Sequence, residues 1–260
     1  MSHLNQYLAA LDLDAGLPKF ELLNLMIARH MATFCFNNID LLLNKDQILS
    51  LGFDDIQDKI VTRRRGGYCF EHNKLFYAMA EKLRLETSAY LARVTFNKDD
   101  EAPLTHRITV VTLDGQGYMA DVGFGRYAPT CLVPLTGEVV TGANGDVFRI
   151  IEDKGVYTLE MIKEGEFFAL YIFEKTQCLE IDFELANYYT NCHPDSGFTK
   201  NLVVARICNN QTLVIRENMY SVIENGIASQ SEITDAKDLQ AKLSQKFEIE
   251  VSDDQAEALF

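Results

Sequence analysis

The sequence predicts a multidomain α+β fold, and three observations support this prediction. Helical periodicity covers the first third of the chain, short β-rich runs fill the middle, and further strands with one helix end it. We therefore expect a helical domain at residues 1–84, an antiparallel β-barrel or sheet at 85–190, and an α/β lid at 191–260. The sequence has no Gly/Ser linker between these domains, so they should pack closely.

The helical domain is predicted from apolar residues that recur three and four positions apart. One such stripe spans residues 4–11 and a second spans 22–31. Pro18 is well placed to start the second helix, because proline is favoured at the first helical position. A short helix is expected at 54–60, and a last one at 69–83.

The β domain is predicted from short runs of β-branched and aromatic residues that Gly, Asp and Asn turns divide. These runs cover residues 88–96, 107–113, 118–122, 147–151, 156–162 and 167–173. The third domain repeats the pattern with strands at 202–206, 212–216 and 220–223, followed by a helix near 235–247. This order predicts antiparallel strands in both regions.

The most informative motif is Arg-Gly-Gly-Tyr-Cys-Phe-Glu at residues 65–71. It places Cys69 at the start of a helix, behind three consecutive arginines at 63–65. A helix N-terminus and nearby positive charge both favour a thiolate and lower a cysteine pKa from about 8.5 to about 3.5–7.5. We therefore expect Cys69 to be a nucleophile, with backbone N–H groups near Tyr68–Phe70 as candidates for an oxyanion hole.

A thiolate nucleophile needs a base and a group that orients the base. His106 stands at the mouth of the strand 107–113, and Asp121 lies in the strand that follows the next turn. We expect His106 to be the base and Asp121 to orient its Nδ1, which makes a triad in the order Cys, His, Asp.

The spacing of this hairpin raises a geometric difficulty. A simple in-register turn at 114–117 would pair Leu113 with Tyr118 and place Asp121 opposite Val110. His106 would then lie about 13 Å further along the strand, too far for a hydrogen bond. The triad therefore requires either a distorted strand or a His106 outside the ladder.

Several further motifs join these residues in resembling one known family. They are Arg65 to Glu71, Ala92 to Val94, Thr105 to Arg107, Asp121 to Gly125, Leu170 to Phe173, Asp182-Phe183, Asn187-Tyr188, His193 to Phe198, and Leu239 to Val251. Together they resemble the arylamine N-acetyltransferases over nearly the whole chain. The resemblance implies a cysteine-protease/transglutaminase-like core, with a terminal helix and closing strand at 239–251.

The resemblance also implies an activity, a role in xenobiotic metabolism and a set of contacts. Cys69 would take an acetyl group from acetyl-CoA, the co-substrate, and pass it to the nitrogen of an arylamine, arylhydrazine or N-hydroxyarylamine, with His106 as base and Asp121 as orienting carboxylate. No metal is expected. We expect these contacts: Phe36, Phe124 and Arg126 to the acceptor, and Phe36, Thr105 and Tyr189 to the coenzyme. Phe124 offers a flat apolar face to an arene.

One departure from the family concerns the loop that carries Cys69. The family usually has Pro-Phe-Glu-Asn where this chain reads Cys35-Phe36-Asn37-Asn38. The missing glutamate would ordinarily pair with the arginine before Gly-Gly, here Arg65. Asn37 carries no charge, and charge-assisted hydrogen bonds are roughly twice as strong as neutral ones. We therefore expect Arg65 to lack its carboxylate partner and the loop to be less rigid.

Other functions remain open alongside acetyl transfer. A transglutaminase-like or papain-like hydrolase has the same triad order, an amide synthase shares the fold, and a degenerate family member would only bind ligands. The net charge of −14 argues against nucleic-acid binding, and the apolar runs are too short to span a membrane. With no signal peptide and six scattered cysteines, a reducing cytoplasmic location is expected. The oligomeric state stays unknown.

Overall fold

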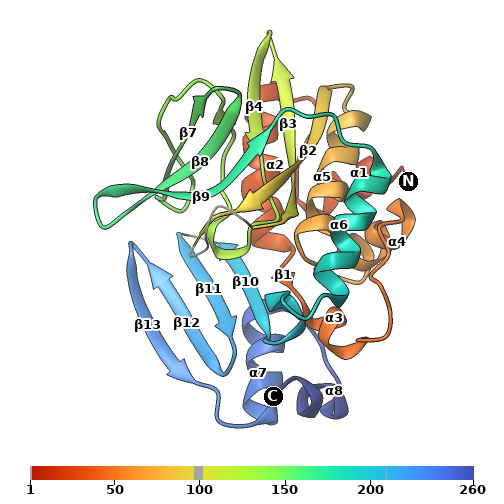
Figure 1. The fold of residues 1–260 in the computed structure, drawn as a ribbon. Coiled ribbons are helices and arrows are strands. Elements are labelled where there is room, and N and C mark those ends of the chain that lie inside the picture. The colour runs from red at the N-terminus through yellow and green to blue at the C-terminus, as the bar shows by residue number, and fades with distance from the viewer. Residues whose placement is uncertain (1, 97–101, 209) are drawn as a thin grey trace.

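Two antiparallel sheets and a group of helices make up the protein, whose computed structural model describes residues 2–96, 102–208 and 210–260 (Figure 1). The first helices are α1 (His3–Ala10), α2 (Lys19–Thr33), α3 (Ile39–Leu43), α4 (Phe53–Gln57) and α5 (Cys69–Lys82). The expected α+β class is confirmed, with a helical N-terminal part, a near-closed antiparallel sheet and a C-terminal α/β part.

The N-terminal helices form where their periodic apolar faces are buried. Pro18 directly precedes α2 and takes the N-cap position rather than the first helical one. The predicted helix at 54–60 is instead α4 followed by a π-helical turn, η1 (Asp58–Thr62). A π-turn is rare and frequently lies at a functional site.

The larger sheet has eight strands in the order β5-β4-β3-β2-β9-β8-β7-β6. Their bounds are β2 (Glu86–Val94), β3 (Leu104–Leu113), β4 (Gln116–Ala120), β5 (Val133–Pro134), β6 (Val140–Thr141), β7 (Val147–Asp153), β8 (Val156–Lys163) and β9 (Glu166–Glu174). The short 3₁₀ helix η2 (Gly125–Tyr127) follows β4. All the pairings are antiparallel, as the sequence predicts.

The expected register of the β3–β4 hairpin is wrong. Leu113 pairs with Gln116, not with Tyr118, and Thr109 pairs with Ala120. The turn therefore has two residues, Asp114 and Gly115, with positive φ values of 50° and 81°. Such a turn matches the twist of the strands that it joins, and Asp-Gly is one of its preferred sequences.

The smaller sheet combines one strand from the N-terminal part of the chain with four strands from the C-terminal part. Its order is β1 (Phe36–Asn37), β10 (Val203–Cys208), β11 (Gln211–Arg216), β12 (Met219–Glu224) and β13 (Ile227–Glu232). Figure 1 shows β1 beside β10, and α7 (Ala236–Phe247) and α8 (Asp253–Leu259) at the C-terminal end. The closing strand expected at the end of 239–251 is absent, because residues 248–252 are irregular and lead into α8.

One helix was not predicted from the sequence. α6 (Glu180–Cys192) follows the larger sheet and lies beside α5 in Figure 1, and a 3₁₀ turn, η3 (Gly197–Thr199), comes after it. The expected domain boundary between residues 190 and 191 falls inside α6. Leu185 and Tyr188 on this helix are exposed, so its apolar residues do not form the simple buried stripe on which the prediction of helices relied.

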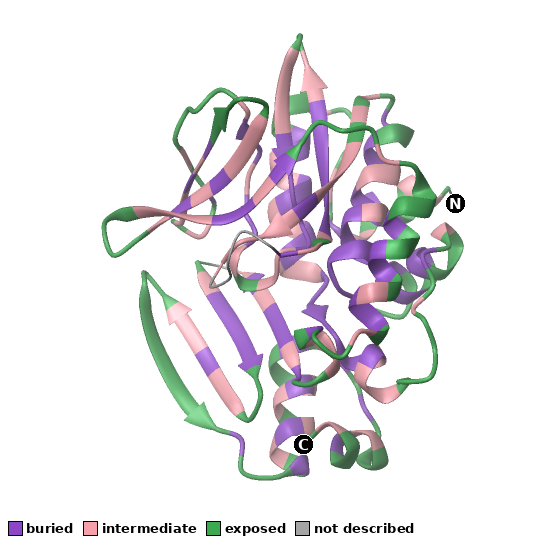
Figure 2. Cartoon of the chain, viewed as in Figure 1, coloured by how far each residue is buried: buried purple, intermediate pink, exposed green. Residues whose placement is uncertain are grey.

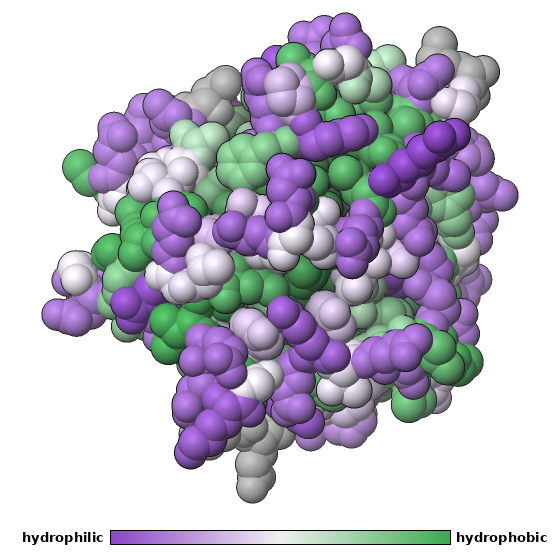
Figure 3. Space-filling model, turned by 90° about the horizontal axis from the view of Figure 1, so that it is seen from above, coloured by the Kyte–Doolittle hydropathy of each residue, from purple (hydrophilic) through white to green (hydrophobic). Residues whose placement is uncertain are grey.

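Burial follows these layers. Figure 2 shows buried residues along α2, α5 and β3, whereas β13 is exposed along its whole length. The largest apolar cluster joins the helices to both sheets, with Val111 from β3 and Ala205 from β10 among its members. From above, hydrophobic residues also reach the surface in places, between hydrophilic ones (Figure 3). Within the described ranges, no helix combines the length and apolarity that a membrane crossing requires.

Candidate active site

Cys69 is the first residue of α5 and is 3% exposed. The two glycines before it are required by close contacts. A Cβ on Gly66, which has a φ of +69°, would lie 2.1 Å from the Cys35 carbonyl oxygen, and one on Gly67 would lie 2.8 Å from Oε2 of Glu71. The loop can therefore pass tightly between β1 and the first turn of α5 only with glycine at both positions.

The thiol of Cys69 faces the start of β3. Its Sγ donates to the carbonyl oxygen of Thr105 at 3.8 Å, and Thr105 directly precedes His106. The loop after β4 closes on the same helix start, because a Cβ on Gly123 would lie 2.9 Å from Cα of Cys69. Glycine at this position therefore lets the Asp121 loop lie against Cys69.

The expected His106–Asp121 contact is present, but through the other ring nitrogen. Nε2 of His106 lies 2.7 Å from Oδ2 of Asp121, with both side chains buried. The expectation that Asp121 orients Nδ1 is therefore wrong. With Nε2–H bonded to the carboxylate, Nδ1 is the nitrogen left to act as a base.

Two residues that the sequence analysis gave no role hold Asp121. The Tyr171 hydroxyl donates to Oδ2 at 2.9 Å, and Nδ2 of Asn73 donates to Oδ1 at 2.9 Å. The Gly123 N–H adds a third donor at 2.8 Å. Tyr171 could have been found as the polar tip on a buried apolar strand, because a buried tyrosine hydroxyl usually has a partner.

The electrostatic environment of Cys69 differs from the expected one. Burial raises the pKa of the Cys69 thiol, and the Asp121 carboxylate raises it further, while the N–H groups of Phe70 and Cys69 oppose this rise. Burial would also raise the pKa of Asp121, but His106, Asn73 and the Gly123 N–H hold it below its ordinary value. A thiolate here therefore needs a nearby base to take its proton.

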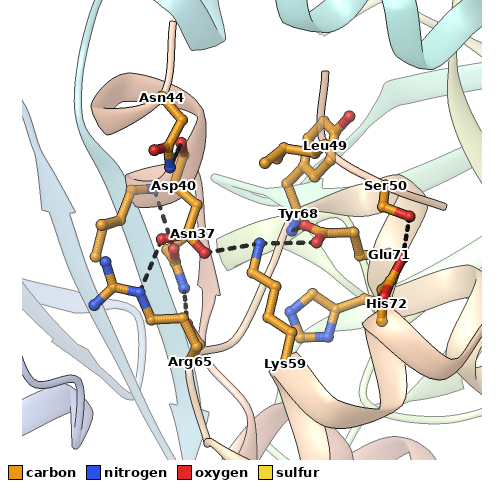
Figure 4. A network of polar contacts seen from close by, with 12 residues as sticks. Asn37, Asp40, Asn44, Leu49, Ser50, Lys59, Arg65, Tyr68, Glu71 and His72 are labelled. Atoms are coloured by element: carbon orange, nitrogen blue, oxygen red, sulfur yellow. Dashed lines mark hydrogen bonds and ion pairs between the residues drawn. The ribbon is translucent and has the colours of Figure 1, made fainter. Parts of the chain in front are cut away.

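The three arginines before the motif do not stabilise the thiolate. Arg63 binds Asp58 at 2.6 Å, and the Arg64 guanidinium lies over the Phe34 ring at 5.0 Å. Nε of Arg65 binds Oδ1 of Asp40 at 2.9 Å (Figure 4). Each cation is thus engaged elsewhere, which explains why the expected lowering of the Cys69 pKa does not occur.

The Arg65–Asp40 pair also corrects the expectation that Arg65 lacks a carboxylate. Asn37 has a separate task, because its Nδ2 donates to the carbonyl oxygens of Arg65 at 2.9 Å and Cys35 at 3.3 Å. Its Oδ1 accepts from the N–H of Ile39 at 3.1 Å. The Nδ2 end of the amide thus ties β1 to the cysteine loop, and its Oδ1 end holds the start of α3; a carboxylate has no donor for the first of these tasks.

One of the backbone N–H groups expected to form an oxyanion hole at Tyr68–Phe70 already donates a hydrogen bond elsewhere. The Tyr68 N–H donates to Oε2 of Glu71 at 3.1 Å and is already engaged. The N–H groups of Cys69 and Phe70 act on the sulfur. These two donors remain as candidates.

The expected substrate contacts divide into those near the triad and those outside it. The Phe124 ring lies 5.0 Å from the His106 ring, and Phe36 lies close to Gly125 and to the His72 ring. Thr105 contacts Cys69 through its carbonyl.

Arg126 and Tyr189 lie outside this group. Arg126 is exposed over the Tyr127 ring at 4.3 Å and lines a separate pocket. This pocket also contains Asn144 and Asp146, and its lining does not include Phe124. On α6, Tyr189 stacks on His193 at 4.2 Å.

Comparisons with known proteins agree with this fold. A family model described as N-acetyltransferase matches residues 19–256. The chain is 30% identical to an arylamine N-acetyltransferase of Mycolicibacterium smegmatis over 257 residues, covering 96% of this chain and 93% of that protein. An Escherichia coli arylamine N-acetyltransferase is 27% identical over 254 residues, with 96% and 90% covered.

Solved structures of arylamine N-acetyltransferases are also similar to this chain. Arylamine N-acetyltransferase of Mycobacterium marinum in complex with CoA has a TM-score of 0.90 at 26% identity, covering 98% of this chain and 97% of that one. The Salmonella typhimurium enzyme shares the fold, with a TM-score of 0.93 at 24% identity over 100% and 99% of the two chains. This chain therefore belongs to the arylamine N-acetyltransferase family and is an acyltransferase.

Proposed function

We propose that the enzyme moves an acetyl group from acetyl-CoA, through an acetyl-cysteine at Cys69, to the nitrogen of an arylamine, arylhydrazine or N-hydroxyarylamine. One observation carries the proposal: the Cys69 thiol faces β3 directly before His106, whose far nitrogen binds Asp121. The CoA complex of the Mycobacterium marinum relative supports acetyl-CoA as the co-substrate.

In the first half-reaction, Nδ1 of His106 takes the proton from Sγ of Cys69. The thiolate attacks the thioester carbonyl carbon, and the bond to the coenzyme sulfur breaks. The coenzyme leaves as a thiol with the proton that His106 returns. Asp121 stabilises the imidazolium between these two proton transfers, and its own ionised state is favoured by His106, Asn73 and the Gly123 N–H.

In the second half-reaction, the acceptor nitrogen attacks the acetyl carbon on Cys69. His106 takes a proton from that nitrogen, and the Cys69 thiolate leaves and is reprotonated. The N–H groups of Cys69 and Phe70 are the proposed donors to the oxyanion in both steps, a role worth about 3–4 kcal/mol per donor where measured.

Contacts to the two substrates are also part of the proposal. Phe124, which lies against His106, supplies an apolar face for the arene, and Phe36, which lies close to Gly125, is a proposed contact to both the acceptor and the coenzyme. Thr105 is proposed to contact the coenzyme because it adjoins Cys69. Tyr189 is a proposed coenzyme contact and Arg126 a proposed acceptor contact, both outside the immediate triad. Xenobiotic metabolism and a cytoplasmic location are proposed too, and the six free thiols support a reducing compartment.

Mass spectrometry of the protein after addition of acetyl-CoA alone tests the intermediate. We expect one added acetyl group on the peptide that contains Cys69, and its loss when an arylamine is added. Steady-state rates should fit a two-step displacement with free CoA released first. Peptide cleavage without acetylation would indicate the papain-like hydrolase. An unmodified Cys69 that resists iodoacetamide would indicate a protein that only binds ligands.

A further inference from the structure

A buried network of two cations and two carboxylates lies under the start of α5 (Figure 4). Nζ of Lys59 lies 2.8 Å from Oε1 of Glu71 and 3.1 Å from Oδ2 of Asp40. Asp40 in turn binds Arg65. The Lys59 and Glu71 side chains are only 10% and 2% exposed. A pair so buried is costly unless both charges are fully engaged.

Glu71 connects this network to the nucleophile. It lies two residues after Cys69, and its Oε2 accepts the Tyr68 N–H at 3.1 Å. The same carboxylate lies against Gly67, where a Cβ would come within 2.8 Å of Oε2. The Glu71 carboxylate therefore fixes the backbone on the N-terminal side of Cys69.

Lys59 holds the other side of the same loop. It lies in the π-turn η1, and its carbonyl oxygen accepts the N–H of Arg65 at 3.0 Å. Its ammonium meanwhile binds Glu71. One residue thus fixes both the beginning of the 65–69 loop, through its backbone, and the end of it, through its side chain.

The charges of Glu71 and Lys59 also affect the protonation of the Cys69 sulfur. Glu71 and Asp121 are the two carboxylates that raise the pKa of Cys69, with His106 as the facing base from β3. Lys59 stays protonated, because Glu71 and Asp40 raise its pKa despite the opposing effect of burial. Its ammonium therefore offsets one of the two carboxylates that oppose the thiolate.

We propose that Lys59 is a positioning residue for Cys69: it holds the Glu71 carboxylate against the Tyr68 N–H and neutralises that carboxylate beside the nucleophile. This inference rests on the proposed function of Cys69. It assigns Lys59 no contact with substrate, so its effect should appear in kcat and in thiol reactivity more than in KM for acetyl-CoA.

The test compares three variants by the pH dependence of iodoacetamide alkylation at Cys69 and by kcat. Lys59→Met should move the alkylation midpoint to higher pH and lower kcat by about tenfold to a hundredfold, as misplacement of a reacting group does. Glu71→Gln keeps an oxygen for the Tyr68 N–H but removes the carboxylate, so its midpoint should move to lower pH. The alkylation midpoint of the double variant should lie between the midpoints of the two single variants.

Lys242→Met is the matched control, because it removes an ammonium from an i,i+4 pair with Asp238 on α7. It should leave the midpoint and kcat unchanged. If Lys59→Met fails to fold, the shift in Glu71→Gln still tests the electrostatic effect. Opposite shifts support the proposal, whereas unshifted midpoints in both folded variants, with only a lower melting temperature, would overturn it. Wild-type protein that neither alkylates nor acetylates at Cys69 would instead refute the proposed function.

Discussion

Nε2 of His106 lies 2.7 Å from Oδ2 of Asp121, across the β3–β4 hairpin. The two-residue turn makes this contact possible. The ladder pairs Thr109 with Ala120, so one further step places Asp121 opposite Ile108. His106 is then a diagonal neighbour on the same face of the sheet, at a separation of about 7–8 Å that the His106 ring and the Asp121 carboxylate together bridge.

Asp121→Asn should lower kcat by orders of magnitude, about 10⁴-fold in an analogous triad. The asparagine amide cannot accept from Nε2 of His106, Tyr171 and Asn73 as a carboxylate does, so the tautomer with a free Nδ1 is lost. The measurement is kcat together with the alkylation of Cys69 against pH. Asp114→Asn at the exposed turn of the same hairpin is the control and should behave as wild type. An unchanged kcat in Asp121→Asn would make Asp121 purely structural.

Cys69→Ser should keep the fold and lose almost all turnover. Serine is nearly isosteric, but its hydroxyl does not ionise near neutral pH in a buried site, so His106 would have to activate a much poorer nucleophile. Turnover and intact mass after addition of acetyl-CoA are the readouts. Cys192→Ser, at an exposed thiol on α6, controls for general loss of cysteine. Activity of Cys69→Ser above a few per cent of wild type would contradict the assignment.

The sequence predicted elements well where one pattern dominates. Strands β7, β8 and β9 were found within a few residues because alternating runs and Gly turns mark both ends. α6 was missed because exposed apolar residues such as Leu185 obscure its buried face. β1 has two residues and is defined by its pairing with β10, a contact between distant segments that no local pattern reports.

The motifs predicted Cys69, His106 and Asp121 as a triad, but they could not predict how these residues lie relative to one another. The hairpin register depended on whether the turn held two residues or four, and this choice moves the position opposite Asp121 by two residues along β3, from Val110 to Ile108. The partner of Arg65 could not be predicted from the sequence either, because Asp40 reaches it from α3, a distant segment of the chain. Side-chain pairing across elements is a property of the packed fold rather than of spacing along the chain.

Arg126→Ala tests whether Arg126, the proposed acceptor contact, favours acceptors that carry a carboxylate. A guanidinium binds a carboxylate through two parallel hydrogen bonds, so kcat/KM for an aminobenzoate should fall about tenfold, or 1.4 kcal/mol. An uncharged aniline should be almost unaffected and is the control substrate. Because Arg126 lines a pocket with Asp146 and not with Phe124, equal losses for both substrates would show that it serves the coenzyme or the fold.

Stability should fall as the pH drops from about 6.5 to 4, because of two buried histidines. His30 and His72 bond to each other at 2.7 Å, and Nε2 of His72 faces the Cys35 carbonyl at 3.2 Å. Burial lowers the pKa of His72 to about 4 and also lowers the pKa of His30. The unfolded chain therefore binds more protons in this window, and the stability is fully present only above pH 6.5.

The expected loss from His72 alone is roughly 3 kcal/mol at pH 4, from 1.36 kcal/mol per pKa unit. Urea unfolding at a series of pH values measures it. A His30→Gln/His72→Gln variant should be less stable at pH 7 but should lose less stability on acidification. An equal loss in wild type and variant would assign the acid sensitivity to other groups.

Asn37→Glu, which restores the usual residue of the family, should destabilise this protein. Asn37 is buried, and its Nδ2 donates to two carbonyl oxygens. A glutamate would face those oxygens without a donor, and Arg65 and Lys59 already bind Asp40. An unsatisfied buried group costs about 1–3 kcal/mol, more when charged. For a chain of this size, each kcal/mol lowers the melting temperature by about 2–4 °C.

The matched comparison is Asn37→Asp, which changes the amide to a carboxylate with almost no change in shape. Both variants should melt below wild type, and both should alkylate Cys69 more slowly because Asn37 ties β1 to the 65–69 loop. Asp40→Asn in the Asn37→Glu background separates two explanations. If glutamate can take over Arg65 once Asp40 is neutral, this double variant should be more stable than Asn37→Glu alone. A melting temperature of Asn37→Glu above wild type would mean that Arg65 leaves Asp40 for the new carboxylate.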